Sequence, residues 1–130
     1  MQVRLIDLVK RFKAVEAMAG VSLTIAEGEF FTLLGPSGCG KTTTLRMIAG
    51  FQKPSDGTIY IGERDVTQVM ANERDIGFVF QNYALFPHLN VYENVAYGLR
   101  VRRQSEGELD RAVGDVLALV GLKGYERQMP

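Results

Sequence analysis

The sequence predicts an α/β protein organised around one strand–loop–helix unit. Residues 29–34 form a short, nearly continuous apolar run, which is typical of a strand that is buried on both faces of a parallel sheet. A glycine-rich loop, residues 35–42, follows this run directly. Residues 41–49 then place apolar side chains at helical spacing, and Gly50 supplies the expected helix stop.

The loop reads GPSGCGKT and fits the pattern G-x-x-x-x-G-K-[ST] without a substitution. Such a loop turns its backbone N–H groups toward a polyphosphate, and its glycines permit the unusual backbone and the close approach. We expect Lys41 to reach the β- and γ-phosphates and the Thr42 hydroxyl to ligate a bridging Mg²⁺, with Thr43 nearby. The alternative is an ordinary glycine-rich turn. The residues expected at the nucleotide phosphates are Ser37, Gly38, Cys39, Gly40, Lys41, Thr42 and Thr43.

Composition excludes several other classes of protein. The 130 residues are 46% hydrophobic and 23% charged, which suits one soluble globular core. Lys and Arg (15) balance Asp and Glu (15), so no basic excess indicates nucleic acid as a partner. Cys39 is the only cysteine, which leaves no disulfide framework and no cysteine metal site. No stretch has the pattern of a membrane span or a signal peptide, so we expect a cytoplasmic chain.

The N-terminal segment predicts two strands before the loop. Residues 3–12 and 17–25 are rich in β-branched and aliphatic side chains, with alternation in the second segment. Their short connection and the turn at residues 26–28 favour an antiparallel element. Phe12 lies at the bend between them, where an aromatic ring either plugs the core or stacks on a nucleotide base.

After the first helix, a dense turn signal at residues 53–57 leads into a predicted strand at 58–62, and residues 64–75 are polar and weakly patterned. A second apolar strand is expected at residues 76–80. Gln81 ends this strand, at the sheet edge where open α/β folds place their ligands, or simply begins a loop.

The C-terminal third predicts two helices behind an apolar loop. Residues 82–87 are apolar enough to be buried against another surface, and His88 has no second metal ligand near it. Asn90 is expected to cap one helix, and the S-x-x-E sequence at Ser105 to cap the next. Gly121 is the expected stop of the second helix. The apolar face expected to be core on the second helix comprises Leu109, Ala112, Val113, Val116, Leu117 and Val120.

These motifs together resemble the N-terminal part of an ABC transporter ATP-binding subunit, over essentially all 130 residues. Residues 35–43 match the Walker A motif of that family, Phe12 its base-stacking aromatic, and residues 79–82 its Q-loop. The sequence QNYALFPHL at residues 81–89 is especially similar to the corresponding segment of importer subunits for polyamines, ferric iron, sulfate and maltose-like sugars. The resemblance implies a P-loop NTPase fold. Its RecA-like core and antiparallel β-subdomain would span residues 1–90, and residues 91–130 would be the start of a helical subdomain.

The resemblance also implies a function, cofactors and partners. ATP and Mg²⁺ would be bound, with Lys41 and Gln81 in catalytic roles, Gln81 also at the metal and the attacking water, and Phe12 and Ala17 beside the nucleotide. The loop after Gln81 would meet transmembrane permease subunits, and a second ATP-binding subunit would pair with this one when ATP binds. An extracytoplasmic solute-binding protein would act indirectly. The subunit would then lie on the inner face of the cell membrane and couple ATP hydrolysis to solute import.

One part of the family pattern does not occur in these residues. The Leu-Ser-Gly-Gly-Gln signature, the Walker B strand with its acidic pair and the switch histidine are not found. We therefore expect a fragment or a truncated product that does not hydrolyse ATP alone. Two alternatives stay open, a non-catalytic nucleotide-binding module and a soluble P-loop kinase or GTPase. The kinase or GTPase explains Phe12 and the loop at residues 83–89 poorly.

Overall fold

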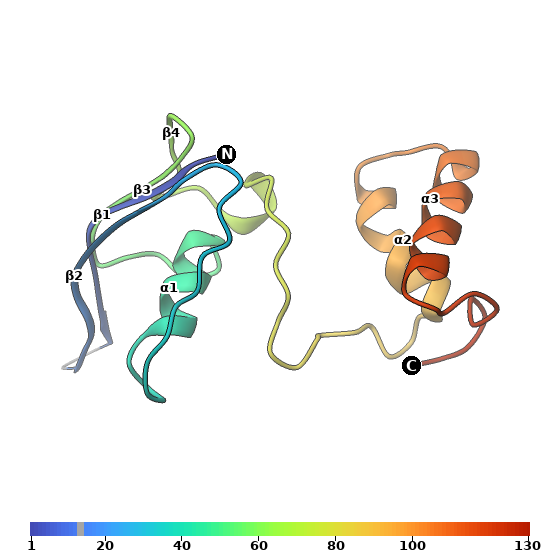
Figure 1. The fold of residues 1–130 in the computed structure, drawn as a ribbon, viewed down its shortest axis with the longest axis horizontal. Coiled ribbons are helices and arrows are strands. Elements are labelled where there is room, and N and C mark those ends of the chain that lie inside the picture. Colours follow the sequence, from blue (N-terminus) through green and yellow to red (C-terminus); the bar gives the residue numbers. More distant parts are fainter. Residues whose placement is uncertain (13–14) are drawn as a thin grey trace. The chain divides into compact units, whose positions relative to one another are not determined.

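A computed structural model describes residues 1–12 and 15–130, which divide into two compact units, Met1–Phe78 and Val79–Pro130 (Figure 1). The first unit holds the strands and one helix, and the second holds two helices. The elements are β1 (Val3–Phe12), β2 (Val15–Ile25), α1 (Lys41–Ile48), β3 (Asp56–Ile61), β4 (Arg64–Asp65), a 3-10 turn η1 (Ala71–Glu73), α2 (Val91–Val101) and α3 (Glu106–Leu119).

The first unit is built on an antiparallel sheet with the strand order β2-β1-β3-β4. β1 pairs with β2 from Val3↔Ile25 to Phe12↔Val15, and it pairs with β3 on its other side. Pairing with β3 stops at Val9↔Asp56, so the last residues of β1 extend past that neighbour. The predicted antiparallel element is confirmed.

Helix α1 packs on one face of this sheet and completes the core of the unit. Met47 is fully buried, and it joins a cluster with residues from β1, β2 and β3. Helical spacing in residues 41–49 predicts that Leu45, Ile48 and Ala49 face the core; Ala49 is buried, but Leu45 is 47% exposed. The buried members of the cluster are Leu5, Leu8, Met18, Met47, Ile59 and Val66.

Two predicted strands do not form. Residues 29–34 and 76–80 are without strand assignment, and Phe30 and Leu34 are each 95% exposed and Val79 80%. A strand requires backbone N–H and C=O groups that pair with a neighbour, and no strand within the described residues pairs with either segment. The apolar pattern indicates burial but does not provide the partner, so both predictions are wrong for this structure.

The polar segment after β4 is tied to α1 by one buried arginine. The Arg74 side chain is only 5% exposed. It donates hydrogen bonds to the carbonyls of Met47 (2.7 Å) and Ile48 (2.6 Å) at the end of α1. It also donates to the carbonyls of Val69 (2.9 Å and 2.7 Å) and Val66. Burial lowers the pKa of this guanidinium, because the charged form loses hydration. The negative end of the α1 dipole offsets part of the free-energy cost of burying the charge.

Gly50 makes room for this arginine and ends α1 as predicted. Its φ of 82° lies in the left-handed region, which glycine adopts without a steric penalty. A Cβ atom here would lie 2.7 Å from Arg74 Nε and 2.8 Å from the Ala71 nitrogen. Any other residue at this position would therefore displace the arginine or the 3-10 turn.

In the second unit, both helices begin with the caps that the sequence predicts. The Asn90 side chain accepts a hydrogen bond from the Glu93 N–H (2.8 Å), and the Glu93 carboxylate accepts one from the Asn90 N–H (3.2 Å). The Glu108 carboxylate accepts hydrogen bonds from the N–H (3.0 Å) and hydroxyl (2.7 Å) of Ser105. These bonds satisfy backbone donors that a helix start leaves without intrahelical partners.

The helices α2 and α3 share a small core of Ala96, Leu109, Val113 and Leu117. A hydrogen bond from the Tyr92 hydroxyl to Asp110 (2.6 Å) joins them and raises the pKa of Tyr92. The prediction that the whole apolar face of α3 is core is wrong at Val116 (45% exposed) and Val120 (59%). The apolar stripe is wider than the surface that α2 covers.

The predicted boundary between the subdomains, after residue 90, stays a prediction. Contacts among the described residues divide the chain after Phe78. No helix in the described part of the chain is both long and apolar enough to cross a membrane.

We predict that Arg74→Met lowers the free energy of unfolding by about 1–3 kcal/mol, because the substitution leaves buried carbonyls without donors. Urea unfolding of the protein measures the loss. Arg64→Met is the matched control, since within the described residues the Arg64 side chain makes one long, exposed hydrogen bond, to the Glu73 carbonyl (3.5 Å). Equal losses in the two variants would contradict the role of Arg74.

We also predict an acid-dependent contribution from the cap of α3. The hydrogen bonds from Ser105 hold the pKa of Glu108 below its usual value of 4.5. A lowered carboxylate pKa stabilises the folded state above the usual value, and this stabilisation disappears as the pH falls through the lowered pKa. The stability difference between the protein and Glu108→Gln should therefore be constant above about pH 4.5 and shrink in acid. Asp115→Asn, within α3, should not reproduce this profile in denaturation measured across pH.

Candidate functional site

The glycine-rich loop runs into the first turn of α1 with two residues in the left-handed backbone region. Gly38 has φ 83°, and Gly40, the N-cap of α1, has φ 95°. The backbone at Gly35 passes close to the Cys39 side chain: a Cβ atom on Gly35 would lie 2.8 Å from Cys39 Sγ. The two glycines that the motif specifies thus have structural reasons: a side chain at Gly35 would clash with Cys39, and Gly40 has a left-handed backbone.

Lys41 folds back into this loop. Its ammonium donates hydrogen bonds to the carbonyls of Gly35 (2.8 Å) and Pro36 (2.7 Å) and lies 3.4 Å from Cys39 Sγ. Carbonyl oxygens are neutral acceptors, and no carboxylate of the described residues forms a salt bridge with Lys41. Among the described residues, the positive charge inside the loop therefore has no carboxylate to neutralise it.

The start of α1 differs from the starts of the other two helices. Within the described residues, no side chain caps α1, and its first turn contains no acidic residue. By contrast, α2 and α3 begin with Asn90–Glu93 and Ser105–Glu108 caps. The first backbone hydrogen bond into α1 runs from the Thr44 N–H to the Gly40 carbonyl (2.8 Å). The preceding N–H groups at the positive end of the helix stay available to an acceptor.

This donor set fits a polyphosphate. One ammonium, several backbone N–H groups and the hydroxyls of Thr42 and Thr43 lie within a few residues of each other in sequence. An anion with many acceptor oxygens satisfies all of these groups at once. The described residues contain no cluster of three or more His, Cys, Asp or Glu side chains that could hold a metal ion.

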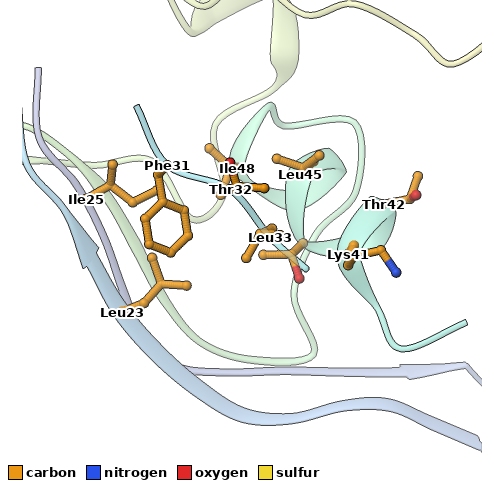
Figure 2. A pocket seen from close by; sticks show the side chains of 10 residues that line it. Leu23, Ile25, Phe31, Thr32, Leu33, Lys41, Thr42, Leu45 and Ile48 are labelled. Carbon is orange, nitrogen blue, oxygen red and sulfur yellow. The ribbon is translucent and has the colours of Figure 1, made fainter. Parts of the chain in front are cut away.

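A pocket of about 360 Å³ lies in the first unit between β2, the apolar run and α1. Figure 2 shows the Phe31 ring near Leu23 and Ile25, whereas Lys41 and Thr42 lie at the other end, where the helix begins. Because most of the lining is apolar, this space does not suit phosphate. The residues that line it are Leu23, Ile25, Phe31, Thr32, Leu33, Lys41, Thr42, Thr44, Leu45 and Ile48.

The other residues predicted for the site are Phe12, Ala17 and Gln81. Phe12 ends β1 and is 44% exposed, so it is not the core plug that the sequence left possible. Its role in base stacking stays a prediction. The side chain of Ala17 lies outside the described part of the chain. Gln81 is exposed and belongs to the second unit, so its assignment to the phosphates and the metal also stays a prediction.

The loop after Gln81 has an exposed tip and an anchored base. Tyr83 and Leu85 are 76% and 58% exposed, and Tyr83 has a left-handed φ of 60°. The Asn94 side chain accepts a hydrogen bond from the Phe86 N–H (2.9 Å) and donates to the carbonyls of Phe86 (3.1 Å) and Leu89 (2.9 Å). The apolar tip is therefore presented from a fixed base rather than buried within the described residues.

Sequence reasoning missed Lys10, whose ammonium lies 5.2 Å from the centroid of the Phe12 ring. A signal was available, because residues two apart on a strand point to the same face. Arg74 was missed as well, since its partners at the end of α1 are 26 and 27 positions away along the chain and no local pattern marks them.

The loop and the start of α1 together define a protein of the P-loop class. The match to a family is more specific: residues 18–130 match the family described as ABC transporter. The chain belongs to this family.

Curated relatives carry the names of import ATP-binding proteins. A spermidine/putrescine import ATP-binding protein PotA from Rubrobacter xylanophilus is 55% identical over 128 residues, which are 98% of this chain and 34% of that protein. An Fe(3+) ions import ATP-binding protein, FbpC 1, from Rhizobium meliloti is 52% identical over 124 residues, 95% of this chain and 35% of that protein. The chain thus spans about a third of the length of these relatives.

Solved structures agree with this assignment. The cassette MJ0796 in a dimeric post-hydrolysis state bound to ADP and Pi superposes with a TM-score of 0.86 at 31% identity, over 98% of this chain and 61% of that one. A second dimeric structure of this bacterial ABC transporter cassette gives a TM-score of 0.88, with the same identity and coverage. The predicted resemblance and the predicted fold class are both confirmed.

Proposed function

We propose that residues 35–43 bind the phosphates of Mg²⁺-ATP. The observation that carries this proposal is that, among the described residues, no carboxylate pairs with the Lys41 ammonium and no side chain caps the start of α1 beside it. Lys41 binds the β- and γ-phosphates, and the Thr42 hydroxyl is a ligand to Mg²⁺. Mg²⁺ usually keeps several waters and phosphate oxygens as ligands, so it needs few ligands from the protein, and Thr42 supplies one of them.

For the whole protein we propose an ATP-binding subunit that couples ATP hydrolysis to solute import across the cytoplasmic membrane. The names of the relatives, which include spermidine/putrescine and Fe(3+) importers, support this class of activity. The protein is then peripheral on the inner face of the membrane. Gln81 contacts the metal and the attacking water, and Phe12 and Ala17 lie beside the nucleotide.

The proposed partners are transmembrane permease subunits and a second ATP-binding subunit, with a solute-binding protein acting indirectly. The exposed Tyr83 and Leu85 on a loop anchored by Asn94 support the permease contact, since they form an apolar surface on a fixed base. The dimeric state of the superposed cassette supports the paired subunit. A soluble kinase or GTPase is disfavoured by the family match.

We predict that Lys41→Ala weakens binding of a fluorescent ATP analogue by about ten- to hundredfold, because hydrogen bonds to a charged group are lost. Arg46→Ala is the control, since Arg46 belongs to the last turn of α1 rather than to the loop. Titration of both variants measures the effect. An unchanged dissociation constant for Lys41→Ala would refute the phosphate-loop assignment.

We further predict that residues 1–130 alone bind ATP without releasing phosphate above background. Hydrolysis needs a positioned proton acceptor and stabilisation of the developing charge, and each contributes orders of magnitude to the rate. The family's acidic pair and signature do not occur in these residues. Colorimetric phosphate release tests this. Sustained turnover from a monodisperse sample would show instead that a carboxylate such as Glu63, Asp65 or Asp75 acts as base.

A further inference from the structure

The aromatic ring at the end of β1 has a cation on one of its faces. The Lys10 ammonium lies 5.2 Å from the centroid of the Phe12 ring, within the range at which a cation is attracted to the π-face. The two residues are two positions apart on the same strand, so both side chains extend from the same face of the sheet.

The position of this cation is fixed by backbone atoms. Lys10 Nζ donates a hydrogen bond of 2.6 Å to the carbonyl of Lys53, in the turn that leads into β3. The same turn is attached to the end of β1 by two further bonds. The Ser55 N–H donates to the Val9 carbonyl (2.8 Å), and the Ser55 hydroxyl accepts from the Arg11 N–H (3.0 Å). The overhanging end of β1 is thus held at three points by one turn.

This arrangement restricts how a planar ligand can approach Phe12. The ring is 44% exposed, so it offers surface to a ligand, but Lys10 covers one of its faces. An aromatic side chain stacks a nucleobase only with a face that is uncovered and correctly tilted. A cation held by the Lys53 carbonyl limits the rotation of the ring, so a base that stacks on Phe12 would use the face opposite the ammonium.

We propose that Lys10 is a positioning residue for the nucleobase of the bound nucleotide. It acts through Phe12, by holding the ring and by reserving the face opposite the ammonium for adenine, and it does not contact the phosphates. The inference rests on the proposed function, since it assumes that Phe12 is the stacking aromatic of the ATP site.

The test compares ATP with inorganic triphosphate, which has the same phosphates and no base. Isothermal titration of Lys10→Met should show ATP binding weakened by about two- to fivefold, the share expected of an exposed cation–π contact. Triphosphate binding should be unchanged. Lys10→Arg should retain the affinity for ATP, because a guanidinium also lies over an aromatic face. A merely structural role for Lys10 would not change the ratio of the two affinities.

Arg4→Met is the matched control. Its guanidinium lies 4.9 Å from the centroid of the Tyr60 ring, so the variant removes a similar cation–π contact in the same sheet. Its affinities for ATP and triphosphate should both equal those of the unmodified protein. If Arg4→Met bound ATP more weakly but triphosphate equally well, loss of any cation–π pair in the sheet would weaken base binding. That result would overturn the specific role of Lys10.

A double variant tests whether Lys10 acts on ATP binding through the Phe12 ring. Phe12→Ala should weaken ATP by about five- to hundredfold and leave triphosphate nearly intact. Adding Lys10→Met to Phe12→Ala should then cause no further loss, since the ring through which Lys10 acts is gone. Additive losses, or equal losses for ATP and triphosphate in Lys10→Met, would overturn the proposal.

Failure of the inference and failure of the proposed function give different results. If the unmodified protein binds neither ATP nor triphosphate, the nucleotide site itself is refuted, and the inference with it. If the protein binds both ligands and Lys10→Met has the same affinity for ATP, the role of Lys10 alone is refuted.

Discussion

The buried guanidinium of Arg74 is the interaction on which the rest of the first unit depends. Its hydrogen bonds to the carbonyls of Met47 and Ile48 attach the end of α1 to the segment that follows β4. Met47 is also the α1 side chain in the buried cluster beneath the sheet. These contacts hold the C-terminal end of α1, the helix into which the phosphate loop leads.

The two ends of α1 differ in whether the chain supplies a group that complements the helix dipole. At its C-terminal end, the negative pole of the dipole meets a cation that belongs to the chain, Arg74. At its N-terminal end, the positive pole has neither a side-chain cap nor an acidic residue among those described. Helices α2 and α3 have caps from their own sequence. In this chain a helix start without a cap coincides with the proposed ligand site.

Local signals in the sequence predicted local structure well. The span of β1, the caps at Asn90 and Ser105 and the stop at Gly50 all depend on neighbouring residues, and all of them are found in the structure. Features that depend on distant partners were not predictable. The run at residues 29–34 has the composition of a strand but no paired neighbour among the described residues, and the bonds from Arg74 to the end of α1 span 26 and 27 positions. The phosphate loop was recognised because its motif is contiguous, whereas Lys10 needs the ring and the turn at Lys53 together.

The hydrogen bonds from Lys41 to the Gly35 and Pro36 carbonyls have a thermodynamic consequence. A phosphate that recruits this ammonium must replace internal acceptors, so ligand binding is an exchange of partners rather than a simple gain. The measured affinity is then a difference between two sets of bonds. A substitution that weakened only the internal set would tighten the complex, although it adds no contact to the ligand. The Gly35 and Pro36 carbonyls thus compete with the ligand for the same three ammonium protons.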